Sequence, residues 1–192
     1  MEEKELFFKR NAQTSDSKHR LKFNLWHFVN QYFFRTSPKV FGRWRCFLLR
    51  AFGAKIGKGC YISSKATIYK PWLLEMGNCS SIDDFCYFVG PVTIGDYVSI
   101  GNNVHLVAGG HDVWSRGFEV TDKRITINHG AFIGAGAFIG MGCEIGQMAV
   151  IGAHCQITEN VPENTIVALG KTKYLKCRRL TTEEYSKYRY NY

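Results

Sequence analysis

Large aliphatic residues recur every six positions over most of the chain, and small or polar residues fill the intervals. This period fits neither an α-helix, which repeats about every 3.6 residues, nor a long strand, which alternates with a period of about two. Twelve of the fifteen recurring residues are isoleucine, in a chain with only fourteen isoleucines, so composition cannot explain the pattern. The recurring residues are Ile56, Ile62, Ile68, Met76, Ile82, Phe88, Ile94, Ile100, Leu106, Ile127, Ile133, Ile139, Ile145, Ile151 and Ile157.

The six-residue period predicts an all-β solenoid of short strands. One large residue of each hexad would point inward, and a small or β-branched residue two positions earlier would fill the corner. Glycine follows the large residue in eight of the fifteen hexads, and we expect it to permit the sharp turn into the next strand. Three hexads make one triangular coil, and stacked coils place the large residues in a continuous column. Five coils are predicted, at 56–73, 76–93, 94–111, 127–144 and 145–162.

The N-terminal flank has a helical pattern instead. Between Leu21 and Phe52, apolar residues at helical spacing predict two amphipathic helices separated at Pro38. The helices either cap the end of the solenoid or rest on an anionic membrane. The expected organisation is a helical basic flank (1–52), the solenoid (53–170) and a basic tail (171–192). The basic residues expected on the solvent-facing side of the helices are Arg35, Lys39, Arg43, Arg45 and Arg50.

The formal net charge of +9 comes from the two flanks. Residues 1–52 carry eleven Lys and Arg against four Asp and Glu, residues 171–192 seven against two, and residues 53–170 seven against ten. A nucleic-acid-binding domain would need a basic stripe on the main domain, so nucleic acid is not expected as a partner. Basic flanks suit a membrane surface, an anionic cofactor or an acidic saccharide.

The sequence shows neither a secretion signal nor an apolar run that could span a bilayer, so a cytoplasmic location is expected, with the inner face of the membrane as an alternative. Seven cysteines without a CxxC pair indicate neither a disulfide framework nor a zinc knuckle. Four of them precede a recurring residue by two positions and are expected as small core residues. These are Cys60, Cys86, Cys143 and Cys155.

Apart from a two-residue insertion at Leu74 and Glu75, the six-residue period has one long interruption, after Leu106. The next recurring residue, Ile127, comes 21 positions later, and the two halves are in phase only if residues 112–126 form an external loop. Gly109, Gly110 and His111 lie at the start of this loop. Because functional residues concentrate on loops positioned by a regular scaffold, His111 is the first candidate for a functional residue.

The repeat resembles the left-handed parallel β-helix of the hexapeptide-repeat acyltransferases, with their pattern of aliphatic–Gly–x–x–small–x. Residues 125–127 resemble the return segment after that family's active-site loop, and residues 158–162 its closing segment. The segment at 49–57, which leads into the repeat, and the Lys-Pro-Trp at 70–72 resemble the colanic-acid and capsule O-acetyltransferases most closely. The resemblance implies an acetyl-CoA-dependent O-acetyltransferase that acts on a cell-surface saccharide, with active sites between the subunits of a homotrimer.

The resemblance also implies that His111 is the catalytic base. Acetyl transfer from a thioester to a hydroxyl requires removal of the hydroxyl proton, which a neutral imidazole accomplishes near neutral pH. Gly109 and Gly110 would allow a ligand to approach the backbone and could donate N–H groups to the developing oxyanion. Since no serine or cysteine nucleophile is needed, we expect direct transfer in a ternary complex rather than through an acyl-enzyme.

Other site residues follow from the same resemblance. Ser81 stands where sugar acetyltransferases have an asparagine that meets the substrate, and this departure leaves the sugar undetermined. Ser81 and Asp83 could bind a sugar hydroxyl, or they could form a solvated turn. Trp114 in the external loop could stack on a sugar ring or only anchor the loop. The expected coenzyme A contacts are Ala135, Ala153 and Thr158, with Lys171 and Lys173 near the phosphates unless the tail is merely solvated.

Three alternatives bear on the function. A three-histidine zinc site, found on this fold in carbonic-anhydrase-like proteins, would need a His-x4-His pair that this sequence lacks, so no metal is expected. A serine or other small-molecule acetyltransferase would be favoured by a long helical N-terminal domain, whereas only residues 1–52 precede the repeat here. A non-catalytic scaffold would not need the His111 loop.

Overall fold

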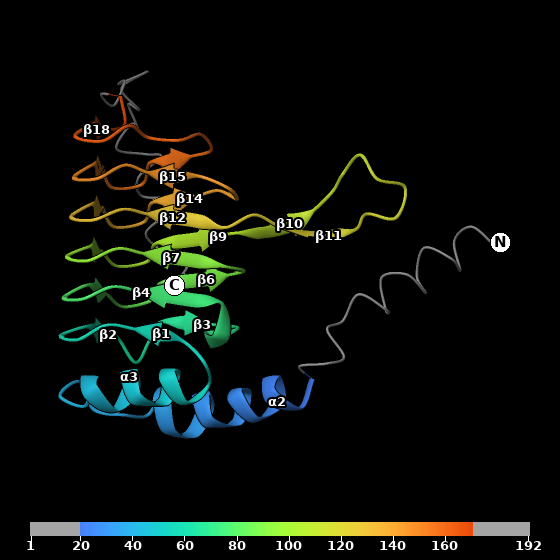
Figure 1. Ribbon diagram of the computed structural model, residues 1–192, viewed down its shortest axis with the longest axis vertical. Helices are drawn as coiled ribbons and strands as arrows, with labels where there is room; N and C mark the ends of the chain where they lie inside the picture. Colours follow the sequence, from blue (N-terminus) through green and yellow to red (C-terminus); the bar gives the residue numbers. More distant parts are fainter. Residues whose placement is uncertain (1–19, 171–192) are drawn as a thin grey trace, which may run out of the picture.

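The computed structural model describes residues 20–170, which form a layer of helices at one end of a stack of short parallel strands (Figure 1). Each complete turn of the stack contributes one strand to each of three sheets. The first sheet contains β1 (Lys55–Ile56), β4 (Leu74–Met76), β7 (Val92–Ile94), β12 (Ile125–Ile127) and β15 (Glu144–Ile145). The second contains β2 (Tyr61–Ile62), β5 (Ser81–Ile82), β8 (Ser99–Ile100), β13 (Phe132–Ile133), β16 (Val150–Ile151) and β18 (Ile166–Val167). The third contains β3 (Thr67–Ile68), β6 (Tyr87–Val89), β9 (His105–Val107), β14 (Phe138–Ile139) and β17 (Gln156–Ile157), and a 3₁₀ turn, η3 (Pro71–Leu73), separates β3 from β4.

The recurring aliphatic residues align from one turn to the next. In the second sheet, Ile82 pairs with Ile62 on one side and with Ile100 on the other, and Ile100 pairs in turn with Ile133. Fourteen of the fifteen recurring residues are buried, and Ile56, in the first turn, is half-buried. The predicted parallel β-solenoid is therefore confirmed, and the column of aliphatic side chains is its core.

The stack has about six turns rather than the predicted five. Val161 forms a parallel bridge with Ile145, and β18 pairs with β16, so a further partial turn lies above the last predicted one. Val161 follows Ile157 by four residues instead of six because the corner between them is shorter. The six-residue frame therefore ended one turn too early.

The hexad glycines serve a different purpose from the expected one. Within residues 20–170, no glycine that directly follows a recurring residue has a positive φ. The left-handed backbone falls two positions later, at Gly136 but also at Tyr97 and His154. A Cβ added to Gly134 would lie only 2.6 Å from the backbone nitrogen of Ala153 in the next turn. Glycine is required there because the next turn passes directly over it, whereas the sharp corner is made elsewhere.

The cysteines behave as small packing residues. Cys86, Cys143 and Cys155 are buried and Cys60 is half-buried, as the sequence predicted. Burial raises the pKa of Cys86 to about 11 and also raises the pKa of Cys143. A buried thiol with a raised pKa is a poor nucleophile, which fits a packing role.

Two helical segments cap one end of the solenoid. The first is α2 (Arg20–Val29), which continues into the π-helical η2 (Asn30–Phe34), and the second is α3 (Gly42–Ala51). Trp26, Phe34 and Leu49 are buried beneath the first turn, and Trp26 Nε1 donates a hydrogen bond of 2.8 Å to the carbonyl oxygen of Ile68. The two predicted helices, separated near Pro38, are therefore confirmed, and their inner side covers the open end of the strand stack.

Arg45 contradicts the expectation of a fully solvent-facing row of basic residues, because its side chain is completely buried. Its Nε donates to the carbonyl oxygen of Ile62 at 2.6 Å, and Nη1 donates to Ser37 Oγ and to the Pro38 carbonyl oxygen. Nη2 donates to the carbonyl oxygen of Lys39 at 2.9 Å. The guanidinium loses water but keeps hydrogen-bond partners, so it ties the loop between the helices to the first turn.

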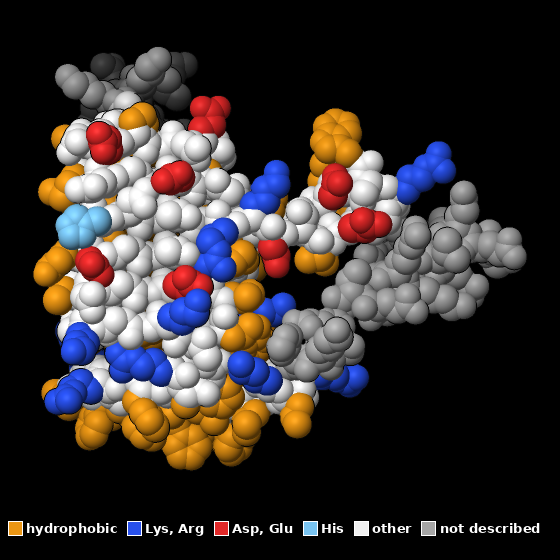
Figure 2. Space-filling view, in the orientation of Figure 1, with side chains coloured by type: hydrophobic (Ala, Val, Ile, Leu, Met, Phe, Trp, Pro, Cys, Tyr) orange, Lys and Arg blue, Asp and Glu red, His pale blue; other side chains and the backbone are white. Residues whose placement is uncertain are grey.

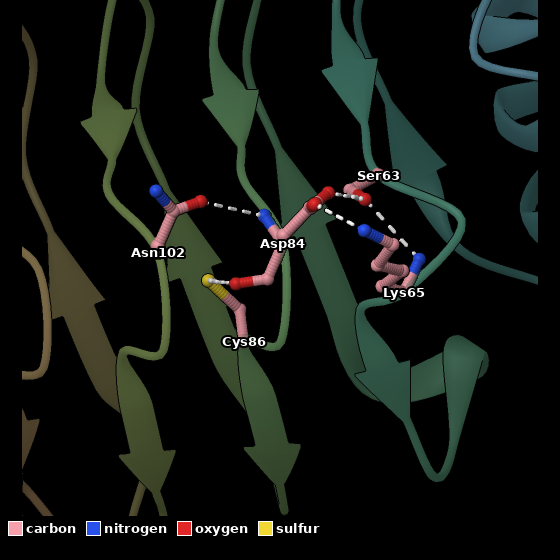
Figure 3. A network of polar contacts seen from close by, with 5 residues as sticks. All are labelled: Ser63, Lys65, Asp84, Cys86 and Asn102. Atoms are coloured by element: carbon pink, nitrogen blue, oxygen red, sulfur yellow. Dashed lines mark hydrogen bonds and ion pairs between the residues drawn. The ribbon is translucent and has the colours of Figure 1, made fainter.

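Polar side chains link successive turns along the edge between the second and third sheets (Figure 3). Asp84 accepts a hydrogen bond from Ser63 Oγ and pairs with Lys65 Nζ at 2.9 Å, both from the preceding turn. Its backbone N–H donates to Asn102 Oδ1 of the following turn at 3.1 Å. The hydrogen bond from Ser63, followed by that from Lys65, lowers the pKa of Asp84. The ionised carboxylate thus joins its own turn to the preceding one, and the backbone N–H of the same residue extends the link to the following turn.

Candidate active site

A β-hairpin carries His111 away from the stack (Figure 1). Strand β10 (Gly109–His111) follows β9 almost directly and pairs antiparallel with β11 (Val120–Asp122), with His111 opposite Val120. The N–H of Lys123 donates to the carbonyl oxygen of Ala108 at 2.9 Å and closes the base of the hairpin. The chain then re-enters the first sheet at β12. We call residues 109–124 the arm.

The arm differs in its limits from the predicted external loop, 112–126. It begins three residues earlier because Gly109 already pairs with Asp122. It ends earlier because Ile125 is buried in β12, opposite Val92 of the turn below. Ile125 occupies the corner position two residues before a recurring residue, so it belongs to the next hexad rather than to the loop.

His111 is held in one orientation within the arm. Its Nδ1 lies 2.8 Å from the carbonyl oxygen of Phe118, and its ring stacks on the Phe118 ring with a centroid distance of 5.2 Å and an interplanar angle of 25°. A carbonyl oxygen can only accept, so Nδ1 carries the proton and Nε2 of the neutral ring holds the free lone pair. The exposed imidazole can therefore receive a proton from a ligand.

The tip of the arm is ordered by its own polar side chains. Asp112 Oδ1 accepts a hydrogen bond from the N–H of Trp114 at 2.9 Å, and Ser115 Oγ accepts one from the N–H of Glu119 at 3.1 Å. Trp114 projects outward and is 93% exposed, and Arg116 is also exposed. So large an exposed indole offers a surface for a ligand or another chain.

The backbone at Gly110, next to His111, is open on the side where a side chain would project. A Cβ added to Gly110 would meet nothing within 4 Å, whereas one added to Gly109 would lie 2.9 Å from Asp122 Oδ1. Gly110 therefore leaves open space next to the imidazole, on the strand that carries it. A ligand can approach this backbone more closely than it could if a side chain were present.

Three other predicted site residues lie along a different edge of the solenoid. Asp83, Ala135 and Ala153 occupy corners between the second and third sheets, in the second, fourth and fifth turns. The arm with His111 leaves instead from the edge between the third and first sheets. Within a single chain, the width of the third sheet therefore separates the candidate base from these residues.

The remaining predicted residues are also dispersed. Ser81 lies on the outer side of the second sheet, with its Oγ 3.4 Å from Ser99 Oγ. Thr158 is exposed on the edge from which the arm leaves, but near the far end of the stack. Lys171 and Lys173 lie outside the residues that the structure describes.

The structure reveals an aromatic column on the third sheet that the sequence analysis did not identify. The ring of His105 lies 5.6 Å from that of Tyr87, and Tyr69 meets Tyr87 edge-on at 5.5 Å. A hydrogen bond with Tyr69, followed by burial, raises the pKa of Tyr87 above its ordinary value. The sequence held a signal for this contact, because Tyr87 and His105 are three hexads apart and each precedes a recurring residue.

A small polar cavity of about 140 Å³ lies beside this column, between the helical layer and the third sheet. His27, Gln31, Arg35 and Tyr69 are among its lining residues. Asn30 also lines the cavity, and its Oδ1 is buried without a hydrogen-bond partner in the structure. A buried acceptor without a partner is unusual in a folded protein.

Within residues 20–170, no three side chains of His, Cys, Asp or Glu gather closely enough to hold a metal ion. His105 on β9 and His111 on the arm have other contacts. His105 lies against Tyr87, and His111 faces the carbonyl oxygen of Phe118.

Two curated relatives match most of the chain. It is 34% identical over 165 residues to an inferred colanic acid biosynthesis acetyltransferase, WcaF, of Escherichia coli strain K12, and the alignment covers 85% of this chain and 90% of the relative. The protein of the same name from Shigella flexneri matches equally well. No family model matches the chain.

Solved structures share the fold. A hexapeptide-repeat-containing acetyltransferase of Vibrio cholerae superposes with a TM-score of 0.72 at 20% identity, covering 79% of this chain and 88% of that chain. The same protein complexed with acetyl coenzyme A gives a TM-score of 0.70 at 20% identity, with coverage of 79% and 84%. A maltose O-acetyltransferase of Clostridium difficile 630 gives a TM-score of 0.63 at 21% identity, with coverage of 79% and 83%. At these identities the likeness concerns the fold alone.

Proposed function

Because the chain belongs to the hexapeptide-repeat acetyltransferase family, we propose that it transfers an acetyl group from acetyl coenzyme A to a hydroxyl of a saccharide. The observation that carries this proposal is the contact between His111 Nδ1 and the Phe118 carbonyl oxygen, which leaves Nε2 free to act as a base. The relatives named for colanic acid biosynthesis support a cell-surface polysaccharide, or its precursor, as the acceptor.

The reaction needs one base and no covalent intermediate. Nε2 of His111 accepts the proton of the acceptor hydroxyl while the hydroxyl oxygen attacks the thioester carbonyl carbon. A C–O bond forms, the C–S bond breaks, and the imidazolium returns the proton to the departing thiolate of coenzyme A. The Phe118 carbonyl oxygen accepts the Nδ1 hydrogen throughout and favours the positive charge that develops on the ring.

We propose that two chains complete each active site, within a homotrimer. His111 and Trp114 lie on the arm, whereas Asp83, Ala135 and Ala153 lie on another edge of the same solenoid. An arm that reaches the corresponding edge of a neighbouring subunit would unite the base with these residues and would cover the exposed indole of Trp114. Cyclic symmetry then repeats the site at every interface.

The outer side of the third sheet suits a saccharide acceptor. Tyr69, Tyr87 and His105 present aromatic rings and polar atoms next to the arm, and sugar rings pack their apolar side against such rings. For the donor, we propose that Ala135 and Ala153 lie along the pantetheine chain, with Thr158 nearby and Lys171 and Lys173 near the phosphates. Since the reaction consumes acetyl coenzyme A, we place it in the cytoplasm.

A direct assay tests the proposal. The purified protein is incubated with acetyl coenzyme A and a panel of oligosaccharides, free sugars and serine, while thiol release and product mass are followed. We expect turnover with oligosaccharides and a product heavier by one acetyl group. Faster turnover of serine or a free sugar would identify a small-molecule acetyltransferase instead. Absence of thiol release with every acceptor, from a folded protein, would indicate a non-catalytic scaffold.

A further inference from the structure

The helical layer turns a row of large apolar side chains away from the solenoid (Figure 2). We call this surface the outer helical face. Val40 and Leu21 are the most exposed of the row, at 88% and 83%. An apolar surface of this kind is rare on a protein that has no partner there. Its members are Leu21, Leu25, Phe28, Tyr32 and Phe33 from the first helical segment, and Val40, Phe41, Trp44 and Phe47 at the second.

The outer helical face is not needed to cap the solenoid. The capping contacts come from the opposite side of the same helices, through Trp26, Phe34 and Leu49. On the outer side, aromatic rings of the face pack on one another, as in the stacked pair Trp44 and Phe47, whose ring centroids are 5.6 Å apart. A surface helix normally turns polar side chains outward, so helices that are apolar on both sides have two faces to cover.

The surroundings of this face are strongly basic. Residues 20–74 contain eleven Lys and Arg and no Asp or Glu, and Glu75 is the first acidic residue after them. All but the buried Arg45 are at least partly exposed, and Lys and Arg side chains follow the rim of the apolar row (Figure 2). Two copies of this face would bring like charges together, so its charge disfavours self-association and favours an anionic partner.

We propose that the outer helical face lies on an anionic lipid bilayer. Aromatic rings are favoured at the depth of the lipid head groups, and a basic rim attracts anionic lipids. The chemistry matches an amphipathic helix that lies in the plane of the membrane surface. In the described part of the chain, no helix is long and apolar enough to cross a bilayer, so the contact is a surface contact.

The architecture permits this contact. The helices lie across one end of the stack, so a flat surface can touch both at once, and the stack of turns extends away from that surface (Figure 1). The arm leaves the side of the stack after β9 and is not part of the contact surface. Membrane binding and acetyl transfer therefore use different residues and can be tested separately.

Sedimentation with vesicles tests the proposal on the full chain. Vesicles of phosphatidylcholine alone are compared with vesicles containing about a quarter phosphatidylglycerol. We expect the protein to sediment with the anionic vesicles and to dissociate as salt is raised, because salt screens the basic rim. A protein that stays in the supernatant with anionic vesicles at low salt would overturn the proposal.

Variants identify the surface responsible. The double variant Val40→Ser and Phe47→Ser should weaken binding about tenfold or more, because it removes apolar side chains that would enter the bilayer. Arg43→Glu should weaken binding and reduce its salt dependence. Matched controls outside the face, Tyr97→Ser and Lys123→Glu, should bind like the wild type.

Two outcomes would refute the assignment of membrane binding to the outer helical face even if the protein binds vesicles. Equal binding by the face variants and the wild type would place the membrane contact elsewhere. A change of oligomeric state in the face variants, without a change in vesicle binding, would show that another copy of the chain covers the face. Thermal unfolding of each variant verifies that it is folded. Acetyl transfer to a water-soluble acceptor should be unchanged in the face variants, so failure of either proposal can be recognised independently.

Discussion

His111 Nδ1 lies 2.8 Å from the carbonyl oxygen of Phe118, seven residues along the same hairpin. The same residue stacks its phenyl ring on the imidazole at a centroid distance of 5.2 Å. One residue thus sets both the tautomer of the imidazole, through its backbone, and the orientation of the ring, through its side chain. This arrangement leaves Nε2 free, and both contacts lie within the arm.

Loss of the Phe118 ring should slow catalysis without unfolding the protein. In Phe118→Ala the backbone carbonyl remains but the imidazole can rotate, so we expect kcat to fall about 10- to 100-fold, as for other misplaced catalytic groups. Phe118→Tyr keeps the ring and should retain the rate. Val120→Ala, which truncates the residue opposite His111 in β11, is the matched control and should have a smaller effect. Equal loss in the alanine and tyrosine variants would contradict the positioning role.

The aromatic column should act on the acceptor rather than on the donor. Removing the ring in Tyr87→Ala should raise the KM for the saccharide about three- to tenfold, since a ring contact contributes about 0.5–1.5 kcal/mol. The KM for acetyl coenzyme A should not change. Steady-state kinetics with each substrate varied in turn makes the comparison. A change confined to the KM for acetyl coenzyme A would place the donor, not the saccharide, on the third sheet.

Asp84 should make the stability of the fold depend on acidic pH. Its pKa is lowered in the folded state from an ordinary value of 3.8, so the carboxylate stabilises the fold above that value. The contribution is lost as pH falls through the lowered folded-state pKa. Thermal unfolding should therefore show a deficit in Asp84→Asn near neutral pH that shrinks as the pH falls below 3.8 and disappears below the lowered folded-state pKa.

The causes of this shift can be separated. The hydrogen bond from Ser63 lowers the pKa of Asp84, and Lys65 lowers it through both its hydrogen bond and its charge, so Ser63→Ala and Lys65→Gln should each reduce the pH dependence. An unchanged pH dependence in either variant would show that the substituted residue does not hold the carboxylate in its ionised form.

The closeness of successive turns should be visible in the stability of glycine variants. Gly134→Ala places a methyl group against the backbone of Ala153 and should cost about 1–3 kcal/mol in the free energy of unfolding, as overpacking does elsewhere. Gly110→Ala adds the same atom in open space and should change the free energy of unfolding by less than about 0.5 kcal/mol. Chemical denaturation measures both. Equal effects would mean that the hexad glycines are not required for stacking.

The solenoid could be predicted because its signal is repeated in the chain. Each large residue, such as Ile100 or Ile133, meets its equivalent in the next turn, so the six-residue period reports directly on the core. The last partial turn was missed because one short corner puts Val161 out of frame. The limits of the arm were missed because a gap in the period shows that a loop is present but not where the loop ends. Ile125, two positions before the recurring Ile127, is already a corner residue of the next hexad.

The site was harder to predict, since its contacts are not periodic. His111 was identified from the break in the repeat, but its partner Phe118 depends on the pairing of β10 with β11, which no spacing in the sequence indicates. Burial of Arg45 was missed for a similar reason. Helical spacing places a basic residue on a side of the helix, but the carbonyl oxygens that accept from Arg45 come from the first turn and from the loop before α3.

The most direct measurement compares the wild type with His111→Asn in acetyl transfer from acetyl coenzyme A to a saccharide acceptor. Asparagine can still donate a hydrogen bond to the Phe118 carbonyl oxygen, so the arm should keep its shape, but it cannot accept a proton as a base. We predict that kcat falls about 100- to 10,000-fold, with unchanged thermal unfolding and an unchanged KM for acetyl coenzyme A. A variant that retains the wild-type kcat would contradict the assignment of His111 as the base.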